Sequence, residues 1–203
     1  MDLTGWDYQV LAAPVDESVW PDELPEAYVQ RLAWEKAQAV VPLIPQAEKS
    51  PAVILAADTT VVLENDILGK PSDAVEAEIM LRRLRDRSHQ VNTALCVLKP
   101  GIGFALSEVV ATQVRMRDYT DGEIRAYIAT GDPFDKAGAY AIQHAVFHPV
   151  QNLQGCYANV MGLPVCHLVR MMAKLELQPG SSIVQACESA LDRPCDVFLQ
   201  LVD

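Results

Sequence analysis

The fold is decided by the stretch Ala52-Val53-Ile54-Leu55-Ala56-Ala57-Asp58-Thr59-Thr60-Val61-Val62-Leu63. Its first six residues are a continuous apolar run, which predicts a strand buried on both faces. The run stops at Asp58, so we expect this residue to end a buried strand. A carboxylate there is costly unless it is solvated at a cleft, paired, or bound to a metal. Strand ends in open α/β sheets are common ligand sites, but Asp also starts turns, and both interpretations stay open.

Helix signals lie on both sides of this stretch. Helical spacing of apolar residues begins at Pro25 and is ended by Pro42 and Pro45. Capping-box patterns predict helices after Asp73 and Thr120, each with a glutamate three residues later. Further helices are expected from Pro164 to about Lys174 and over residues 183–191.

Strands are expected elsewhere from apolar and β-branched runs. The expected ranges are 8–12, 91–98, 108–116, 145–150 and 156–161, with an apolar end at 197–202. Helices and strands alternate irregularly, with adjacent strands in the middle of the chain. This order predicts an α/β protein with a mixed sheet.

Composition limits the kinds of partner. The chain has 203 residues, of which 50% are hydrophobic and 21% charged, which is typical of one globular domain. The formal net charge is −11. Because nucleic-acid polymers are bound by a basic face, we expect none as a partner. A small anionic ligand held by a few lysines or a metal ion remains compatible with this charge.

No membrane partner is expected either. Residues 1–6 lack the basic and apolar segments of a signal peptide. The range 137–169 contains no Asp, Glu, Lys or Arg, but prolines, glycines and polar residues interrupt it. A membrane span needs about 20 predominantly apolar residues. We therefore expect a cytoplasmic protein.

The cysteines and histidines give no metal signature. The cysteines are Cys96, Cys156, Cys166, Cys187 and Cys195. Their number is odd and no two form a CxxC motif, which argues against a disulfide framework and a zinc knuckle. We expect reduced, mostly buried thiols. The spacing of the four histidines is not typical of a metal site.

Two carboxylates and three lysines are the candidate functional residues: Glu17, Asp58, Lys36, Lys70 and Lys136. Taken singly, Glu17 and Lys36 are typical of a solvated surface. Lys70 lies between a glycine and a proline that could aim it at a phosphate, and Lys136 precedes small residues that permit close backbone approach. If these residues converge, the carboxylates could hold a divalent metal and orient a water, while the lysines offset phosphate charge.

The candidate residues lie in an ordered series of motifs that resembles the Maf family of nucleoside triphosphate pyrophosphatases. The matching stretches are Val15-Asp16-Glu17-Ser18, Arg31-Leu32-Ala33, Glu35-Lys36-Ala37, Ala57-Asp58-Thr59-Thr60-Val61-Val62, Leu68-Gly69-Lys70-Pro71, Met80-Leu81, Arg87-Ser88-His89-Gln90-Val91-Asn92-Thr93, Asp135-Lys136-Ala137-Gly138-Ala139-Tyr140-Ala141-Ile142-Gln143 and Asn159-Val160-Met161-Gly162-Leu163-Pro164. One such motif would be weak evidence, whereas the ordered series over residues 5–174 is specific.

The resemblance implies a two-lobed α/β fold with a central cleft, similar to the inosine triphosphatase group. Residues 1–174 would form the Maf-like pyrophosphatase domain, and residues 175–203 a C-terminal extension. The implied reaction is hydrolysis of a nucleoside triphosphate to the monophosphate and pyrophosphate, with Mg²⁺ or Mn²⁺ as the cofactor. The family is often dimeric, so a homodimer is a further expectation.

Residue roles carry over by position. Asp58 matches the family's proton acceptor, which would activate the water that attacks the α-phosphorus. Glu17 matches an acidic residue of the cleft and would hold the metal together with Asp58. Lys36, Lys70 and Lys136 match the lysines on the phosphate side.

Two further positions concern the base. Thr59 and Gln143 match positions that set base preference. The Asp-Thr and Ile-Gln pairs resemble the branch that acts on dTTP and UTP rather than the branch that acts on 7-methyl-GTP. His144 and Ala141 stand where glycines are usual in the family, and Cys156 stands where a serine is usual.

The beginning of the sequence departs from the family. Family members begin with a strand and a Ser-Pro-Arg-Arg loop, which offers helix N–H groups and an arginine to phosphate. Here Gly5-Trp6-Asp7-Tyr8 already matches the residues after that first helix. Two hypotheses stay open. One is an active dTTP/UTP pyrophosphatase that starts upstream of Met1 or manages without the loop; the other is a catalytically impaired nucleotide-binding or regulatory relative.

Overall fold

The computed structural model describes residues 1–195 and 197, which contain one five-stranded sheet of order β2-β1-β3-β4-β5. The strands are β1 (Ile54–Leu63), β2 (Asp66–Leu68), β3 (Ser88–Lys99), β4 (Phe104–Met116) and β5 (Val150–Gln154). Each described pair is antiparallel. The α/β class is confirmed, but the sheet is antiparallel rather than mixed, because strands adjacent in the sheet run in alternating directions.

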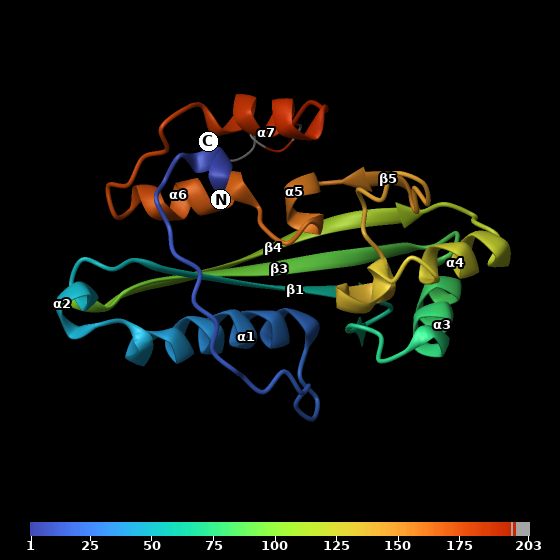
Figure 1. Cartoon of the computed structure of the whole chain (residues 1–203), viewed down its shortest axis with the longest axis horizontal. Coiled ribbons are helices and arrows are strands. Elements are labelled where there is room, and N and C mark those ends of the chain that lie inside the picture. The colour runs from blue at the N-terminus through green and yellow to red at the C-terminus, as the bar shows by residue number, and fades with distance from the viewer. Residues whose placement is uncertain (196, 198–203) are drawn as a thin grey trace.

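Three long strands form the centre of the molecule, and helices cover both of their faces (Figure 1). On one face Ala94 packs against α1 (Pro25–Val40). On the opposite face Leu95 packs against α6 (Val165–Ala173). Successive side chains of a strand point to opposite faces, so a strand covered on both sides is apolar throughout. This arrangement explains why the sequence of β3 is nearly free of charge.

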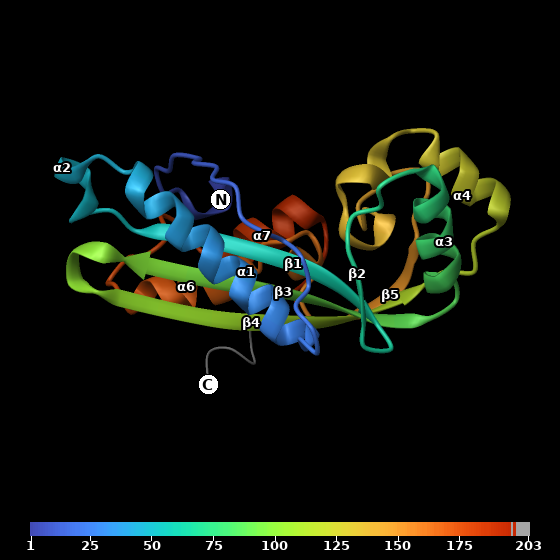
Figure 2. The same cartoon turned by 90° about the horizontal axis from the view of Figure 1, so that it is seen from below.

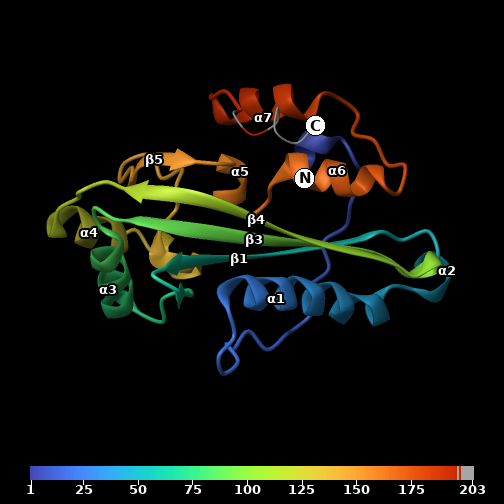
Figure 3. The same ribbon diagram turned by 180° about the vertical axis from the view of Figure 1, so that it is seen from behind.

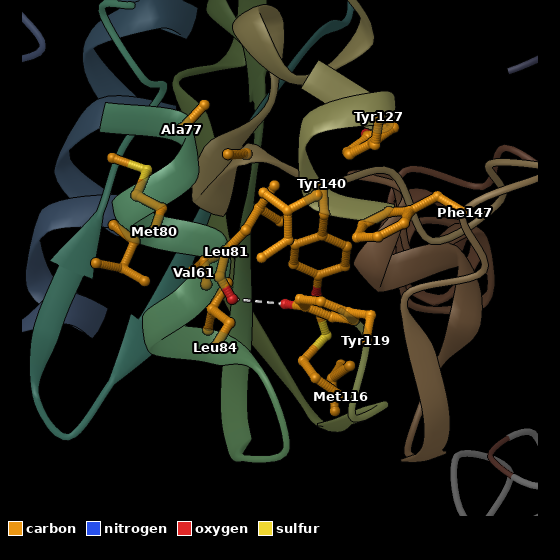
Figure 4. Close-up of a cluster of buried hydrophobic side chains, with 14 of the residues drawn as sticks. Val61, Ala77, Met80, Leu81, Leu84, Met116, Tyr119, Tyr127, Tyr140 and Phe147 are labelled. Atoms are coloured by element: carbon orange, nitrogen blue, oxygen red, sulfur yellow. Dashed lines mark hydrogen bonds between the residues drawn. The ribbon is translucent and has the colours of Figure 1, made fainter. Parts of the chain in front are cut away.

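A second lobe lies at one end of the sheet, around α3 (Ala74–Leu84) and α4 (Asp121–Ile128) (Figure 2). Its core is a cluster of buried aliphatic and aromatic side chains. In that core the Tyr119 hydroxyl donates a hydrogen bond of 2.7 Å to the carbonyl of Leu81, which satisfies the one polar atom of a fully buried ring (Figure 4). The two lobes expected from the resemblance are therefore present.

Side-chain caps begin both helices of this second lobe, as the sequence predicted. The Asp73 carboxylate accepts a hydrogen bond of 2.8 Å from the Glu76 N–H. At α4 the Thr120 hydroxyl accepts from the Glu123 N–H, and the Glu123 carboxylate accepts from the Thr120 N–H. These bonds satisfy N–H groups that a helix start otherwise leaves free.

The C-terminal helices gather on the α6 face of the sheet (Figure 3). Helix α7 (Ile183–Leu191) packs against α6, and α5 (Tyr157–Val160) lies beside them. The helices expected from Pro164 and over 183–191 are confirmed. The expected apolar end at 197–202 lies outside the described residues except for Val197.

Short helical turns complete the described chain. They are α2 (Gln46–Lys49) and the 3₁₀ turns Asp2–Thr4, Val41–Leu43, Pro100–Ile102, Asp132–Asp135 and Ala137–Ala139. No helix in residues 1–195 is both long and apolar enough to cross a lipid bilayer.

Three expected strands are corrected by the structure. The segment 8–12 is not a strand, because no neighbouring strand pairs with it among the described residues, and Val10 is 84% exposed. The range 145–150 is largely turns, and the strand β5 follows it. The range 156–161 forms the helical turn α5, because Gly155 at φ 123° ends β5 just before it.

The expected end of a strand at Asp58 is also corrected. The strand β1 runs through Asp58 without a break and pairs with β3 from Ile54 to Val62. A carboxylate is tolerated inside this strand because its side chain is paired with a lysine of α1.

A large groove runs along the outer edge of β1. Residues 5–15 cross over this edge, and β2 pairs only with Val61–Leu63. The groove has a volume of about 1320 Å³ and is lined by residues 5–15, residues 51–57, Glu17 and Lys36. A concave, partly apolar space with a few charged groups at its margin is typical of a small-molecule site.

Candidate active site

The site is built around Asp58 in the middle of β1. Its side chain points to the α1 face of the sheet and is 10% exposed. The ammonium of Lys36, on α1, lies 2.6 Å from Asp58 Oδ1 and 2.6 Å from Glu17 Oε1. A single lysine therefore bridges two carboxylates that are far apart in the sequence.

Helix α1 also holds the segment that carries Glu17. The Tyr28 hydroxyl donates a hydrogen bond of 3.0 Å to the Glu17 carbonyl. The Arg31 guanidinium donates to the Ser18 carbonyl at 2.9 Å and pairs with Glu23 at 2.7 Å. Since residues 17–23 have no sheet or helix of their own, these bonds fix the position of Glu17. Tyr28 and Arg31 lie on the expected helix, but their support of Glu17 was not predicted from the sequence.

Burial and charge act differently on the three groups. Burial raises the pKa of Asp58 above its ordinary value, and the ion pair with Lys36 only partly offsets this effect. The hydrogen bond from Lys36 lowers the pKa of Glu17. Burial alone would lower the pKa of Lys36, but its bonds to Asp58 and Glu17 outweigh burial and raise it. The shift of Asp58 is in the direction that suits a proton acceptor, whereas that of Glu17 favours a permanently charged carboxylate.

Lys70 and Lys136 lie on turns of the other lobe. Lys70 is exposed on the turn after β2, and its charge acts to lower the pKa values of Glu17, Asp58 and Asp135. Lys136 is paired with Asp135 at 2.7 Å. The two lysine-bearing turns are joined, because the Gly138 N–H donates to the Gly69 carbonyl at 3.0 Å.

Replacing Gly138 with alanine tests this junction. Gly138 has φ 69°, and an added Cβ would lie 2.9 Å from Cγ1 of Val61. We expect Gly138→Ala to lower the free energy of unfolding by about 1–3 kcal/mol, because backbone strain and overpacking add. Urea unfolding measures this loss.

Gly131→Ala is the matched control. Gly131 has φ 80°, but no heavy atom lies within 4 Å of its added Cβ. This variant carries the backbone strain without the clash, so its loss should be smaller. Equal losses in the two variants would contradict a cost from the Val61 contact.

Thr59 and Gln143 are not in contact with the carboxylates. The Thr59 side chain points to the opposite face of β1 from Asp58, and its hydroxyl lies 2.8 Å from that of Thr93. Gln143 is exposed, and its side chain makes no hydrogen bond to the described residues.

Of the candidate residues, the structure brings Glu17, Lys36 and Asp58 together, with Lys70 within electrostatic range.

The carboxylates provide the oxygen donors that Mg²⁺ or Mn²⁺ prefers. Within residues 1–195, no three His, Cys, Asp or Glu side chains are grouped as metal ligands. Mg²⁺ is commonly held by one or two carboxylates plus substrate phosphates, so Glu17 and Asp58 suit such an ion. The Lys36 ammonium lies between the two carboxylates. For a metal ion to bind both, Lys36 would have to break its contact with one of them.

Comparisons with known proteins identify the family of the chain. The Maf-like protein family matches residues 1–175. A dTTP/UTP pyrophosphatase of Geotalea uraniireducens (strain Rf4) is 43% identical over 176 residues, which cover 86% of this chain and 88% of the relative. A dTTP/UTP pyrophosphatase of Anaeromyxobacter sp. (strain Fw109-5) is 44% identical over 177 residues, or 86% of this chain and 82% of the relative. The chain belongs to the Maf-like family.

Proposed function

We propose that this chain is a nucleoside triphosphate pyrophosphatase that hydrolyses dTTP or UTP to the nucleoside monophosphate and pyrophosphate. One observation carries the proposal: a largely buried carboxylate with a raised pKa, Asp58, contacts Lys36, and Lys36 lines a groove large enough for a nucleotide. The names of the relatives supply the substrate class.

In this mechanism Asp58 accepts a proton from a water molecule as the water oxygen attacks the α-phosphorus. The bond from the α-phosphorus to the bridging oxygen breaks, and pyrophosphate leaves. Lys36 holds Asp58 in its charged form until the proton is taken. Lys36, Lys70 and Lys136 offset the negative charge of the phosphates.

A divalent cation would be held by Glu17 and Asp58 and would supply further neutralisation of the triphosphate. Thr59 and Gln143 are proposed to contribute to base preference. Gln143 is accessible for this role on its exposed turn. The Thr59 hydroxyl, bonded to Thr93, would act from the other face of β1.

The test is pyrophosphate release by the purified full chain. We expect release from dTTP and UTP in the presence of Mg²⁺ or Mn²⁺, and much slower release from ATP and GTP. Pyrophosphate is measured through phosphate formed by an added inorganic pyrophosphatase, with a sample lacking the chain as the blank. A folded chain that binds dTTP yet releases no pyrophosphate would contradict the enzyme and favour the nucleotide-binding relative.

A further inference from the structure

Four of the five cysteines meet in one place on the far side of the sheet from α1. Cys156 precedes α5, Cys166 lies in α6, Cys187 lies in α7, and Cys195 follows α7. The first three are buried in one apolar cluster. Cys195 borders a small cavity of about 30 Å³ together with Cys156 and Cys187. Figure 1 shows α5, α6 and α7 side by side at this position.

The cluster joins two parts of the chain. Cys156 and Cys166 lie inside the part matched by the family, which ends at residue 175. Cys187 and Cys195 lie beyond that part, in the C-terminal extension. The contact between the extension and the domain is therefore lined with thiols from both sides.

The segment with Cys195 is held in a defined position. Asp192, at φ 49°, ends α7 and turns the chain back. The Arg193 guanidinium stacks 4.8 Å from the centre of the Tyr157 ring, and the Cys195 N–H donates a hydrogen bond of 2.8 Å to Glu188. These contacts place Cys195 at the edge of the thiol cluster, with its side chain beside that of Cys166.

The four thiols differ in access to solvent. Cys156, Cys166 and Cys187 are buried, whereas Cys195 is half-exposed. Burial raises the pKa of the Cys166 thiol to about 12, and it raises the pKa values of Cys156 and Cys187 as well. Because Cys195 is the one thiol of the four that solvent reaches, an oxidant in solution meets it first.

We propose that Cys195 and Cys166 are a peroxide-sensitive thiol pair whose disulfide fastens the C-terminal extension to α6. Hydrogen peroxide oxidises Cys195 to the sulfenic acid and is reduced to water. The Cys166 sulfur then attacks the sulfenic sulfur, the S–S bond forms, the S–O bond breaks, and a second water leaves. Two thiols have been oxidised and one peroxide reduced.

A structural metal site is the alternative role for a group of four cysteines. A tetrahedral zinc site would need all four thiolates around one ion. No three cysteines among the described residues are so arranged. In reducing compartments, the disulfides that form are usually transient ones with a redox-sensing or catalytic role.

The test treats the full chain with hydrogen peroxide and maps disulfides by mass spectrometry of a non-reduced digest. We expect each chain to lose two hydrogen atoms and a Cys166–Cys195 peptide to appear. Closing a loop of roughly 30 residues should raise the melting temperature by about 6–12 °C. Dithiothreitol should reverse both changes.

Variants separate the possible outcomes. Cys195→Ser should abolish the linked peptide and the rise in melting temperature, while Cys96→Ser, in β3, should leave both unchanged. Labelling with iodoacetamide should modify Cys195 before the other three cysteines of the cluster. The proposal is overturned if the linked peptide joins other cysteines or two chains, if oxidation proceeds equally in Cys195→Ser, or if the purified chain carries stoichiometric zinc.

Discussion

Asp58→Asn is expected to lower kcat for pyrophosphate release by about 10²- to 10⁴-fold, which is the usual contribution of a general base. Asparagine has the shape of aspartate but cannot accept the proton of the attacking water. Lys36 keeps its partner Glu17, so the fold and the affinity for dTTP should change little. Initial rates and the dissociation constant of dTTP, measured on one preparation, check both statements.

The pH dependence gives a second measurement on the same residue. Only the charged form of Asp58 can act, and burial raises its pKa. The rate of the natural chain should therefore fall on acidification at a higher pH than an exposed aspartate would require. Any residual rate of Asp58→Asn should lack this decline.

Asp16→Asn is the control. Asp16 is an exposed carboxylate beside Glu17, and it accepts a hydrogen bond of 2.9 Å from the Ser18 N–H. Its loss should leave kcat close to that of the natural chain. The assignment of Asp58 as proton acceptor would be contradicted if Asp58→Asn kept the kcat of the natural chain, or if Asp58→Asn and Asp16→Asn lost kcat equally.

Local signals in the sequence predicted much of the fold. The helices at α1, α3, α4 and α7 were expected from periodicity and capping, because both depend on residues three or four positions apart. The region before α6 was not, since residues 137–169 lack the charges that mark one face of an element. There the decisive features are backbone angles, such as φ 123° at Gly155.

The sequence named Glu17, Lys36 and Asp58 as candidates, but it did not predict how they meet. Asp58 and Lys36 are 22 positions apart, and their contact depends on how α1 crosses the sheet. No local pattern fixes that crossing. For the same reason the supports of Glu17, namely Tyr28 and Arg31, were not identified from the sequence. Alternation along β1 could have separated Thr59 from Asp58, because adjacent strand residues face opposite ways.

His89 is expected to make the fold sensitive to acid. Its side chain is 3% exposed, and its Nε2 lies 2.7 Å from the Tyr140 hydroxyl. Its Nδ1 has no hydrogen-bond partner among the described residues. Burial lowers the pKa of His89 from 6.5 to about 4. Between these two pH values His89 is mostly neutral in the folded chain and mostly protonated in the unfolded chain.

The direction of the effect follows from proton counting. Between pH 6.5 and 4 the unfolded chain binds more protons at His89 than the folded chain, so stability is full above pH 6.5 and falls as the pH falls. The complete loss is about 3 kcal/mol, of which about 2 kcal/mol should appear by pH 5. The pKa of Glu123 is lowered to about 2. Protonation of such carboxylates therefore reduces the stability of the fold mainly at lower pH.

Urea unfolding at pH 6.5 and pH 5 measures this loss. His89→Gln, which keeps a hydrogen-bonding group near Tyr140 without titrating, should lose about 1.5 kcal/mol less than the natural chain over this interval. His148→Asn is the matched control, because His148 is exposed and asparagine tolerates its φ of 42°. It should retain the pH dependence of the natural chain. Identical pH dependence in His89→Gln and the natural chain would contradict this account. It would mean that His89 is protonated in the folded chain as easily as in the unfolded chain, and that burial does not lower its pKa.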